Sequence, residues 1–276
     1  MAEKYPEATG RRRFVKGVVG GAALTGTAGG GAGAVDLLTP RRGVGGGAVT
    51  YYGVENVAGP APRPMPQIPV TVEDGVLEGV WPEPERVERD NETVVVARTE
   101  LGGVTYDSRW FQYCGLQATG AVQPDADRDL TLRHAPNPAY EWQRELDAAG
   151  EPLRVEQFAD YAEWGNDVGQ AGLGKPASAY WRADDPEAAV PVQVIRSERV
   201  EALAGESEWL GASTEAGVLA YANKCTHFCC VPGYKHMAGS AQFDAEDLAF
   251  CPCHQSAYDP FSVVRASYTA LPRPEE

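Results

Sequence analysis

CTHFCC (residues 225–230) and CPCHQS (residues 251–256) are the two most informative stretches of this chain. Together they contain five of its six cysteines and two of its four histidines. Cysteines spread along a small secreted chain would indicate a disulfide framework, whereas five within a span of 29 residues indicate a metal site, with room for a local disulfide. We therefore expect metal chemistry at these two stretches.

Each stretch places a thiolate next to an imidazole. One residue separates Cys225 from His227, and two residues separate Cys251 from His254. Two soft thiolates and two imidazoles on two tight loops, with 23 residues between them, make a closed site with four ligands. From the ligand count alone, a structural zinc ion is the simplest interpretation.

Three further features shift the balance away from a plain zinc site. Cys230 and Cys253 lie beside the ligand pairs without being needed as ligands, so they could bridge the two loops. Each loop also carries a proline, which would stiffen a turn beside the site. Two hydroxyls follow the second histidine, where they could donate hydrogen bonds to sulfur: those of Ser256 and Tyr258.

With these features the sequence resembles the Rieske iron–sulfur proteins, specifically the quinol-oxidising type of cytochrome bc complexes. The two-loop pattern of that family is Cys-Thr-His-x-Gly-Cys-x-Pro and Cys-Pro-Cys-His-Gly-Ser-x-Tyr, and it is similar to CTHFCCVP and CPCHQSAY here. The resemblance implies one [2Fe-2S] cluster, with one iron held by Cys225 and Cys251 and the other by His227 and His254. It also implies an antiparallel β sandwich with a small two-loop cluster-binding subdomain at about residues 218–262.

The same resemblance implies roles for the neighbouring side chains. Cys230 and Cys253 match the disulfide of the family. Ser256 and Tyr258 match the residues that hydrogen-bond a bridging sulfide and a ligand thiolate. His254 is the residue that would contact the quinol.

As for function, the resemblance implies an electron-transfer subunit of a quinol-oxidising enzyme of the quinol–cytochrome c reductase type. Its partners would be quinol, a cytochrome b-type subunit and a downstream cytochrome or copper protein. A Rieske subunit of a molybdenum enzyme or a nitrate-respiration complex is an alternative with the same ligands, and a zinc-binding interaction domain is another. A Rieske oxygenase is disfavoured, because the 22 residues after His254 leave no room for a mononuclear iron domain.

The chain departs from the family pattern in several places. Cys229 and Gln255 stand where the family has glycine, and either side chain could crowd a turn. The chain ends where the family usually has a Gly-Pro loop over the cluster and further closing strands. We expect Cys114 and Cys229 to be free buried thiols. We expect the two remaining histidines to be surface residues: His134 and His236.

The N-terminus has the composition of a targeting segment. Arg11 and Arg12 resemble the twin-arginine export consensus, and an uncharged run of 19 residues with eight glycines follows at 17–35. Such a run is just long enough to cross the hydrocarbon of a bilayer as a helix. We interpret residues 1–38 as a signal that remains as a single membrane anchor, with a cleaved signal peptide as the alternative. The positive-inside rule then places the body outside the cytoplasm, at the plasma membrane.

The rest of the chain divides into a tether and a body. Residues 39–69 are rich in glycine and proline, with five prolines between 60 and 69, and predict a flexible tether. Residues 70–276 form the expected head domain. Its composition predicts mostly β structure, with strands at 93–106, 189–200 and 217–224. Two short helices are also expected, at 139–150 and 155–164.

The formal net charge is -15, from 39 acidic and 24 basic residues. This excess of negative charge argues against nucleic acid as a partner. Only five of the basic residues are lysine, which suggests a surface suited to concentrated salt, although an ordinary acidic composition has the same appearance.

Overall fold

The computed structural model of the chain describes residues 45–89 and 92–274. The expected signal and anchor at residues 1–38 lies outside this range. In the part of the chain that is described, none of the helices combines the length and the apolar character needed to cross a membrane.

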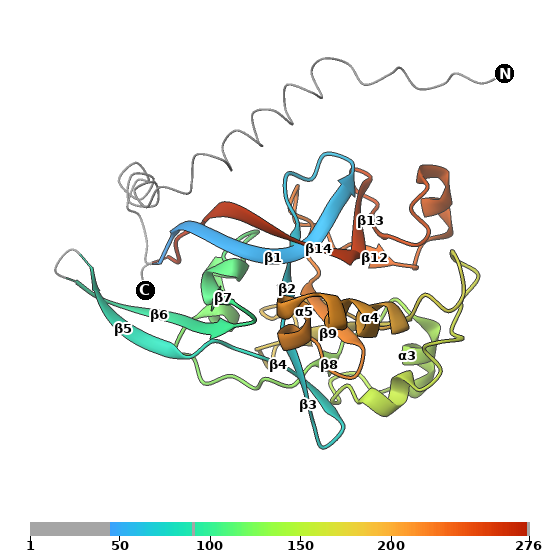
Figure 1. Cartoon of the computed structure of the whole chain (residues 1–276), viewed down its shortest axis with the longest axis horizontal. Helices are drawn as coiled ribbons and strands as arrows, with labels where there is room; N and C mark the ends of the chain where they lie inside the picture. The colour runs from blue at the N-terminus through green and yellow to red at the C-terminus, as the bar shows by residue number, and fades with distance from the viewer. Residues whose placement is uncertain (1–44, 90–91, 275–276) are drawn as a thin grey trace, which may run out of the picture. The chain divides into compact units, whose positions relative to one another are not determined.

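The protein is mostly β, and its largest sheet is antiparallel with nine strands within the described residues. In spatial order the strands are β12 (Gly233–Tyr234), β13 (Ala249–Cys251), β14 (Ser256–Ala270), β1 (Gly47–Ala58), β2 (Met65–Ile68), β11 (Val218–Ala222), β10 (Val190–Arg196), β9 (Lys175–Trp181) and β8 (Arg133–His134). Figure 1 shows β1 and β14 running side by side, although they come from opposite ends of the described chain. Near the middle of the sheet, β2 and β11 are buried along their whole length.

Two smaller antiparallel sheets flank this large one. One is the hairpin of β3 (Val70–Glu73) and β4 (Val76–Gly79), and the other contains β5 (Pro84–Arg89), β6 (Glu92–Leu101) and β7 (Val104–Asp107). The predicted strand, glycine turn and second strand at 93–106 are confirmed by β6 and β7. Gly102 and Gly103 form the turn with φ of 53° and 75°, values that favour glycine.

The helices within residues 45–89 and 92–274 are short. They are α3 (Glu141–Leu146), α4 (Glu198–Glu206) and α5 (Glu208–Ser213), with 3₁₀ turns η1 (Ser108–Phe111), η2 (Leu116–Ala118), η3 (Gly120–Val122), η4 (Val155–Phe158) and η5 (Ala238–Phe243). The first expected helix is present as α3, and the second is only the turn η4. The strand predicted at 189–200 ends earlier, because the Ser197 hydroxyl accepts a hydrogen bond from the Arg199 amide and starts α4.

The expected tether at 39–69 requires a correction. Residues 47–58 form β1, which pairs with β14 from Gly47↔Ala270 to Ala58↔Ala257. Alternate residues of its first half are buried, as expected for a strand with one face on a core. Residues 65–68 form β2, which is fully buried and joins β1 to β11. The folded body therefore includes residues 47–68, whose strands join β14, which follows the loops, to β11, which precedes them.

The expectation of surface histidines is right for one residue and wrong for the other. His236 is exposed. His134 is buried, with its Nδ1 2.9 Å from Gln143 Nε2 and its Nε2 3.2 Å from Gln157 Oε1. The amide of Gln143 donates, so Nδ1 accepts and the ring is neutral. Burial lowers the pKa of His134, in keeping with this structural role.

Candidate metal centre

The two cysteine-rich stretches are loops that meet at one end of the large sheet. The first loop, residues 225–230, follows β11, and the second loop, residues 251–256, connects β13 to β14. Cys225 and Cys251 are 1% exposed and are the free cysteines among the described residues. The rings of His227 and His254 are 4.7 Å apart between centroids, and His254 is exposed. The structure thus brings the predicted ligands together as a buried thiol pair and an outer imidazole pair.

Hydrogen-bond donors surround the Cys225 sulfur. The Tyr258 hydroxyl donates to Cys225 Sγ at 3.3 Å, and the backbone N–H groups of His227 and Phe228 also donate to it. A hydrogen bond from the Cys251 thiol, together with these donors, lowers the pKa of Cys225 to about 5 against the opposing effect of burial. A thiolate therefore forms readily at this position, as a metal ligand requires.

Cys251, like Cys225, is surrounded by backbone donors, but its thiol holds its proton more strongly. Backbone N–H groups of Cys253 and His254 point at its sulfur. The hydrogen bond that the Cys251 thiol donates to Cys225, followed by burial, raises the pKa of Cys251 despite these backbone donors. The remaining proton would be displaced when a metal supplies positive charge to the pair.

His227 carries an unsatisfied atom. Its Nδ1 is buried and has no hydrogen-bond partner among the described residues. Leaving such an atom unpaired costs free energy, so a buried ring nitrogen without a partner fits a metal ligand. The exposed side chain of Phe228 packs against both imidazoles, with its ring 4.3 Å from that of His227 and 5.1 Å from that of His254.

The ligand atoms form two pairs rather than one group. Among the described residues, the sulfurs of Cys230, Cys251 and Cys253 are the one set of three or more ligand-type atoms that all lie within 4.8 Å of one another. Two of these sulfurs are bonded to each other, so the set is not a three-thiolate metal site. A single zinc ion at about 2.0–2.3 Å from each ligand would need all four candidate atoms within roughly 4 Å of one another. The paired arrangement suits a cluster with two irons better.

Disulfides hold the first loop on two sides. Cys230 is bonded to Cys253, the pair implied by the resemblance, and this bond joins the two loops. The neighbouring Cys229 is bonded to Cys114, so the expectation that both would be free thiols is wrong. Sequence reasoning missed this pair because Cys114 is 115 residues away and no local pattern connects it to the loop.

The two residues that stand in place of glycine keep the backbone conformation that glycine favours. Cys229 has φ of 64° and Gln255 has φ of 60°, both in the left-handed region. The loops therefore adopt the turn that the family pattern implies, and the side chains at these positions are accommodated rather than excluded.

A segment of the expected tether lies against the site. Residues 59–64, between β1 and β2, have the sequence GPAPRP. The Ala61 amide donates to the buried Ser256 hydroxyl at 3.1 Å, and Thr226 Oγ1 donates to the Arg63 carbonyl at 2.7 Å. A methyl group at Gly59 would lie 2.4 Å from the Gln255 carbonyl oxygen. This Gly-Pro segment thus lies against both loops, although it precedes them in the chain.

The two predicted hydroxyls have different partners. Tyr258 donates to Cys225, as described above, and accepts from the Thr226 amide at 3.1 Å. Ser256 accepts from Ala61, which leaves its hydroxyl hydrogen for an acceptor on the other side. The sulfur contact is therefore present for Tyr258 and stays a prediction for Ser256.

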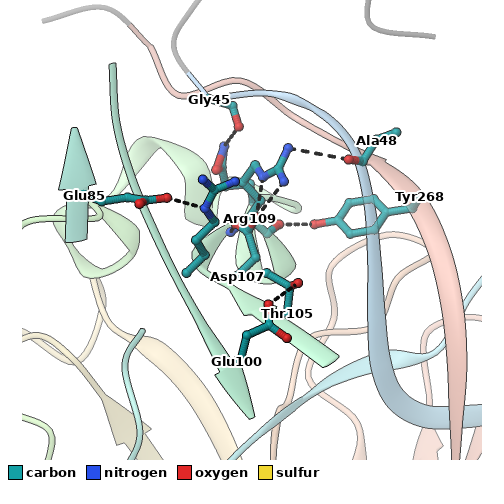
Figure 2. Close-up of polar contacts among 10 residues, drawn as sticks. Gly45, Ala48, Glu85, Glu100, Thr105, Asp107, Arg109 and Tyr268 are labelled. Atoms are coloured by element: carbon teal, nitrogen blue, oxygen red, sulfur yellow. Dashed lines mark hydrogen bonds and ion pairs between the residues drawn. The ribbon is translucent and has the colours of Figure 1, made fainter. Parts of the chain in front are cut away.

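A second concave region lies away from the two loops. It is a groove of about 390 Å³ between β1, β6 and β7, and none of its described lining residues belongs to either loop. Figure 2 shows its polar contacts, in which the Arg109 guanidinium pairs with Asp107 at 2.6 Å and the Tyr268 hydroxyl donates to the Arg109 carbonyl at 2.6 Å. Arg98, which also lines the groove, pairs with Glu85. These contacts link neighbouring parts of the chain and do not indicate a ligand.

Comparison of the chain with models of protein families, with curated proteins and with solved structures gives no match.

Proposed function

We propose that the protein is the Rieske-type [2Fe-2S] electron-transfer subunit of a quinol-oxidising, cytochrome bc-type complex. The observation that carries the proposal is the arrangement of the four ligands in two pairs. Cys225 and Cys251 are buried and contact each other, while His227 and His254 contact each other nearer the surface. The fold that goes with this function is the Rieske-type β sandwich with its two-loop subdomain.

Different residues of the chain would bind the cluster and tune its electron exchange. Cys225 and Cys251 would hold one iron, and His227 and His254 the other. When bound, a cluster of this type supplies a one-electron carrier whose potential is raised because neutral imidazoles replace two thiolates. Tyr258 and the backbone N–H groups of the loops stabilise negative charge on sulfur.

His254 is the residue best placed to meet a partner. Its side chain is exposed, whereas the thiols behind it are buried. An imidazole ring nitrogen that is not bound to metal can accept a hydrogen bond and a proton from a quinol hydroxyl. Electron and proton would then leave the quinol at the same place, with a cytochrome b-type subunit taking the second electron.

The disulfides support a location outside the cytoplasm. Disulfide bonds persist in oxidising compartments, and all four described cysteines other than the ligand candidates are paired. This fits a single-pass plasma-membrane protein with residues 1–38 as twin-arginine signal and anchor. The electron would pass from the head domain to a downstream cytochrome or copper protein.

A second candidate function has the same ligand set. A Rieske subunit of a molybdenum oxidoreductase or of a nitrate-respiration complex would share every residue of the centre. The partners separate the two functions: isolation of the native membrane complex should recover a cytochrome b subunit in the first case and a molybdopterin subunit in the second.

The test of the proposal is metal analysis of the purified full-length chain. We expect two irons and two acid-labile sulfides per chain, with visible absorption that bleaches on reduction. Stoichiometric zinc without iron would contradict the proposal and favour the zinc-binding interaction domain, because zinc is colourless and redox-inert.

A further inference from the structure

We propose that Tyr113 and the Cys114–Cys229 disulfide form a clamp that positions the first loop, and with it Cys225 and His227, for metal binding. We call these residues the 113–114 clamp. The clamp is independent of the Cys230–Cys253 bond, which joins the two loops to each other. The inference rests on the proposed function for its redox consequences and on contacts within the chain for the rest.

The clamp touches the first loop at three places. Tyr113 donates its hydroxyl hydrogen to the Lys224 carbonyl at 3.0 Å, at the point where the chain leaves β11. Cys114 Sγ lies 3.6 Å from the Cys225 carbonyl oxygen. The disulfide then fixes Cys229, at the far side of the same turn. Both ends of the loop are therefore attached to residues 113–114.

The clamp is itself well anchored. Tyr113 is buried, and the Arg63 guanidinium lies 4.4 Å from its ring centroid. The same Arg63 lies over Tyr268 at 3.8 Å and donates to the Tyr51 hydroxyl at 3.2 Å. Tyr51 and Tyr268 belong to the paired strands β1 and β14. The first loop is thus connected through the clamp to the main sheet.

The backbone explains why this connection matters for the ligands. Cys229 donates its N–H to the Cys225 carbonyl at 2.9 Å, and Cys225 donates its N–H to the Cys230 carbonyl at 2.7 Å, which closes the turn. Inside the turn, the N–H groups of His227 and Phe228 point at Cys225 Sγ. Holding position 229 therefore holds the donors that face the sulfur.

The residue choice at position 229 agrees with a positioning role. A non-glycine residue in the left-handed region is strained, and both ends of this disulfide are in that region, with φ of 53° at Cys114 and 64° at Cys229. Glycine would avoid the strain at 229 but could not be cross-linked. The cross-link also restricts the unfolded chain over a separation of 115 residues.

The test uses the full-length chain with Cys114→Ala and Cys229→Gly combined. Glycine suits the backbone at 229, so this double variant removes the cross-link without adding strain. Tyr113→Phe removes only the hydrogen bond to Lys224. As a matched control, Val194→Ala lowers the stability of the buried strand β10 without touching the first loop.

We expect the double variant to shift the oxidised-to-reduced ratio at a fixed potential about tenfold toward the oxidised form, equivalent to about 59 mV for one electron. Weakened N–H donors stabilise the reduced, more negative cluster less, which sets the direction. The electron paramagnetic resonance lines of the double variant should broaden. Tyr113→Phe should shift the ratio in the same direction but by less. Val194→Ala should leave both the ratio and the lines unchanged. A double variant with the ratio and line shape of the parent chain would overturn the inference.

Two measurements keep the inference separate from the proposed function. Peptide mapping of the oxidised parent chain should recover the Cys114–Cys229 bond, and free thiols at both positions would overturn the clamp. If the chain holds no iron, hydrogen exchange at residues 225–229 takes the place of the potential. Faster exchange there in the double variant than in Val194→Ala supports the clamp even where the proposed function has failed, and equal rates overturn it.

Discussion

The first and second loops carry one thiol and one imidazole each, yet the protein supports them differently. The first loop is fixed by the 113–114 clamp, by Tyr258 at its sulfur and by the bond from Thr226 to Arg63. In the second loop, residues 252–255 are exposed. Its attachments include the disulfide to the first loop, the hydrogen bond from Ala61 to Ser256 and the close approach of Gly59.

We infer from this difference that the two loops have separate roles. A loop that is bonded from several sides keeps its donors pointing at sulfur and would so retain a bound metal. A loop with an exposed imidazole can present that ring to another molecule. Segment 59–64 touches both loops, so it couples the supported loop to the exposed one.

The largest effect is expected from removing a ligand, and it should be the same for both loops. His227→Cys in the first loop and Cys251→Ser in the second should each destroy the normal visible spectrum of the cluster, because one iron then has an incomplete or altered ligand set. His236→Asn is the matched control, since this histidine is exposed and outside both loops. An intact spectrum in either ligand variant would mean that the corresponding loop does not hold metal.

The next effect concerns the dependence of the second loop on segment 59–64. Gly59→Ala puts a methyl group 2.4 Å from the Gln255 carbonyl oxygen, at φ of 83°. We expect a loss of about 2–3 kcal/mol in the free energy of unfolding, from strain and from displacement of the second loop. Urea unfolding of the oxidised chain measures it. Gly239→Ala, where a methyl group meets nothing within 4 Å, should change little, and equal midpoints for the two variants would contradict the packing.

A smaller effect is electronic. Tyr258→Phe removes the donor at 3.3 Å from Cys225 Sγ, which stabilises the reduced cluster more than the oxidised one. With about 1.4 kcal/mol of difference, the midpoint potential should fall by roughly 60 mV. Ser256→Ala should lower it by a similar amount if its hydroxyl faces a bridging sulfide. Tyr234→Phe is the control, because that hydroxyl donates to the Leu173 carbonyl instead. Voltammetry at fixed pH and salt decides, and unchanged midpoints with intact clusters in both variants would show that neither hydroxyl faces sulfur.

The smallest effect tests the link between the first loop and segment 59–64. Thr226→Val removes the donor to the Arg63 carbonyl at 2.7 Å and should cost about 1 kcal/mol of unfolding free energy. Thr50→Val removes an exposed hydroxyl contact to Ser267 across β1 and β14, and should stay within about 0.5 kcal/mol of the parent chain. Urea titrations of the two variants side by side give the comparison. If Thr226→Val were as stable as Thr50→Val, the hydrogen bond from Thr226 to Arg63 would not contribute to stability.

The arrangement of the loop residues could be predicted from the sequence because its signals are local. Ligand spacing, the neighbouring cysteines and the hydroxyls at 256 and 258 lie within a few residues of one another, and the structure brings the ligand pairs and the Cys230–Cys253 bond together. The hairpin of β6 and β7 was also predictable, because its two-glycine turn and alternating strands are local signals.

The parts that sequence reasoning missed depend on partners far along the chain. Five prolines between 60 and 69 suggest an extended tether, but β2 lies within this stretch and β1 just before it. Both strands are stabilised by β14 and β11, which no local pattern identifies. The β-branched and aromatic residues of 47–58 and the Gly-Pro dipeptide at 59–60 were the sequence signals that could have placed this segment in the fold. Cys114 and His134 were misjudged for the same reason, since burial and pairing there come from distant residues.

The central claim is that two thiols and two imidazoles of the two loops share one [2Fe-2S] cluster. Pulsed electron paramagnetic resonance of the reduced full-length chain measures couplings from the nitrogens bound to iron. The account predicts couplings from two histidine nitrogens, with the loss of one of them in His227→Cys whenever that variant retains a cluster. A reduced cluster without nitrogen couplings, or a chain that carries zinc in place of iron, would contradict it.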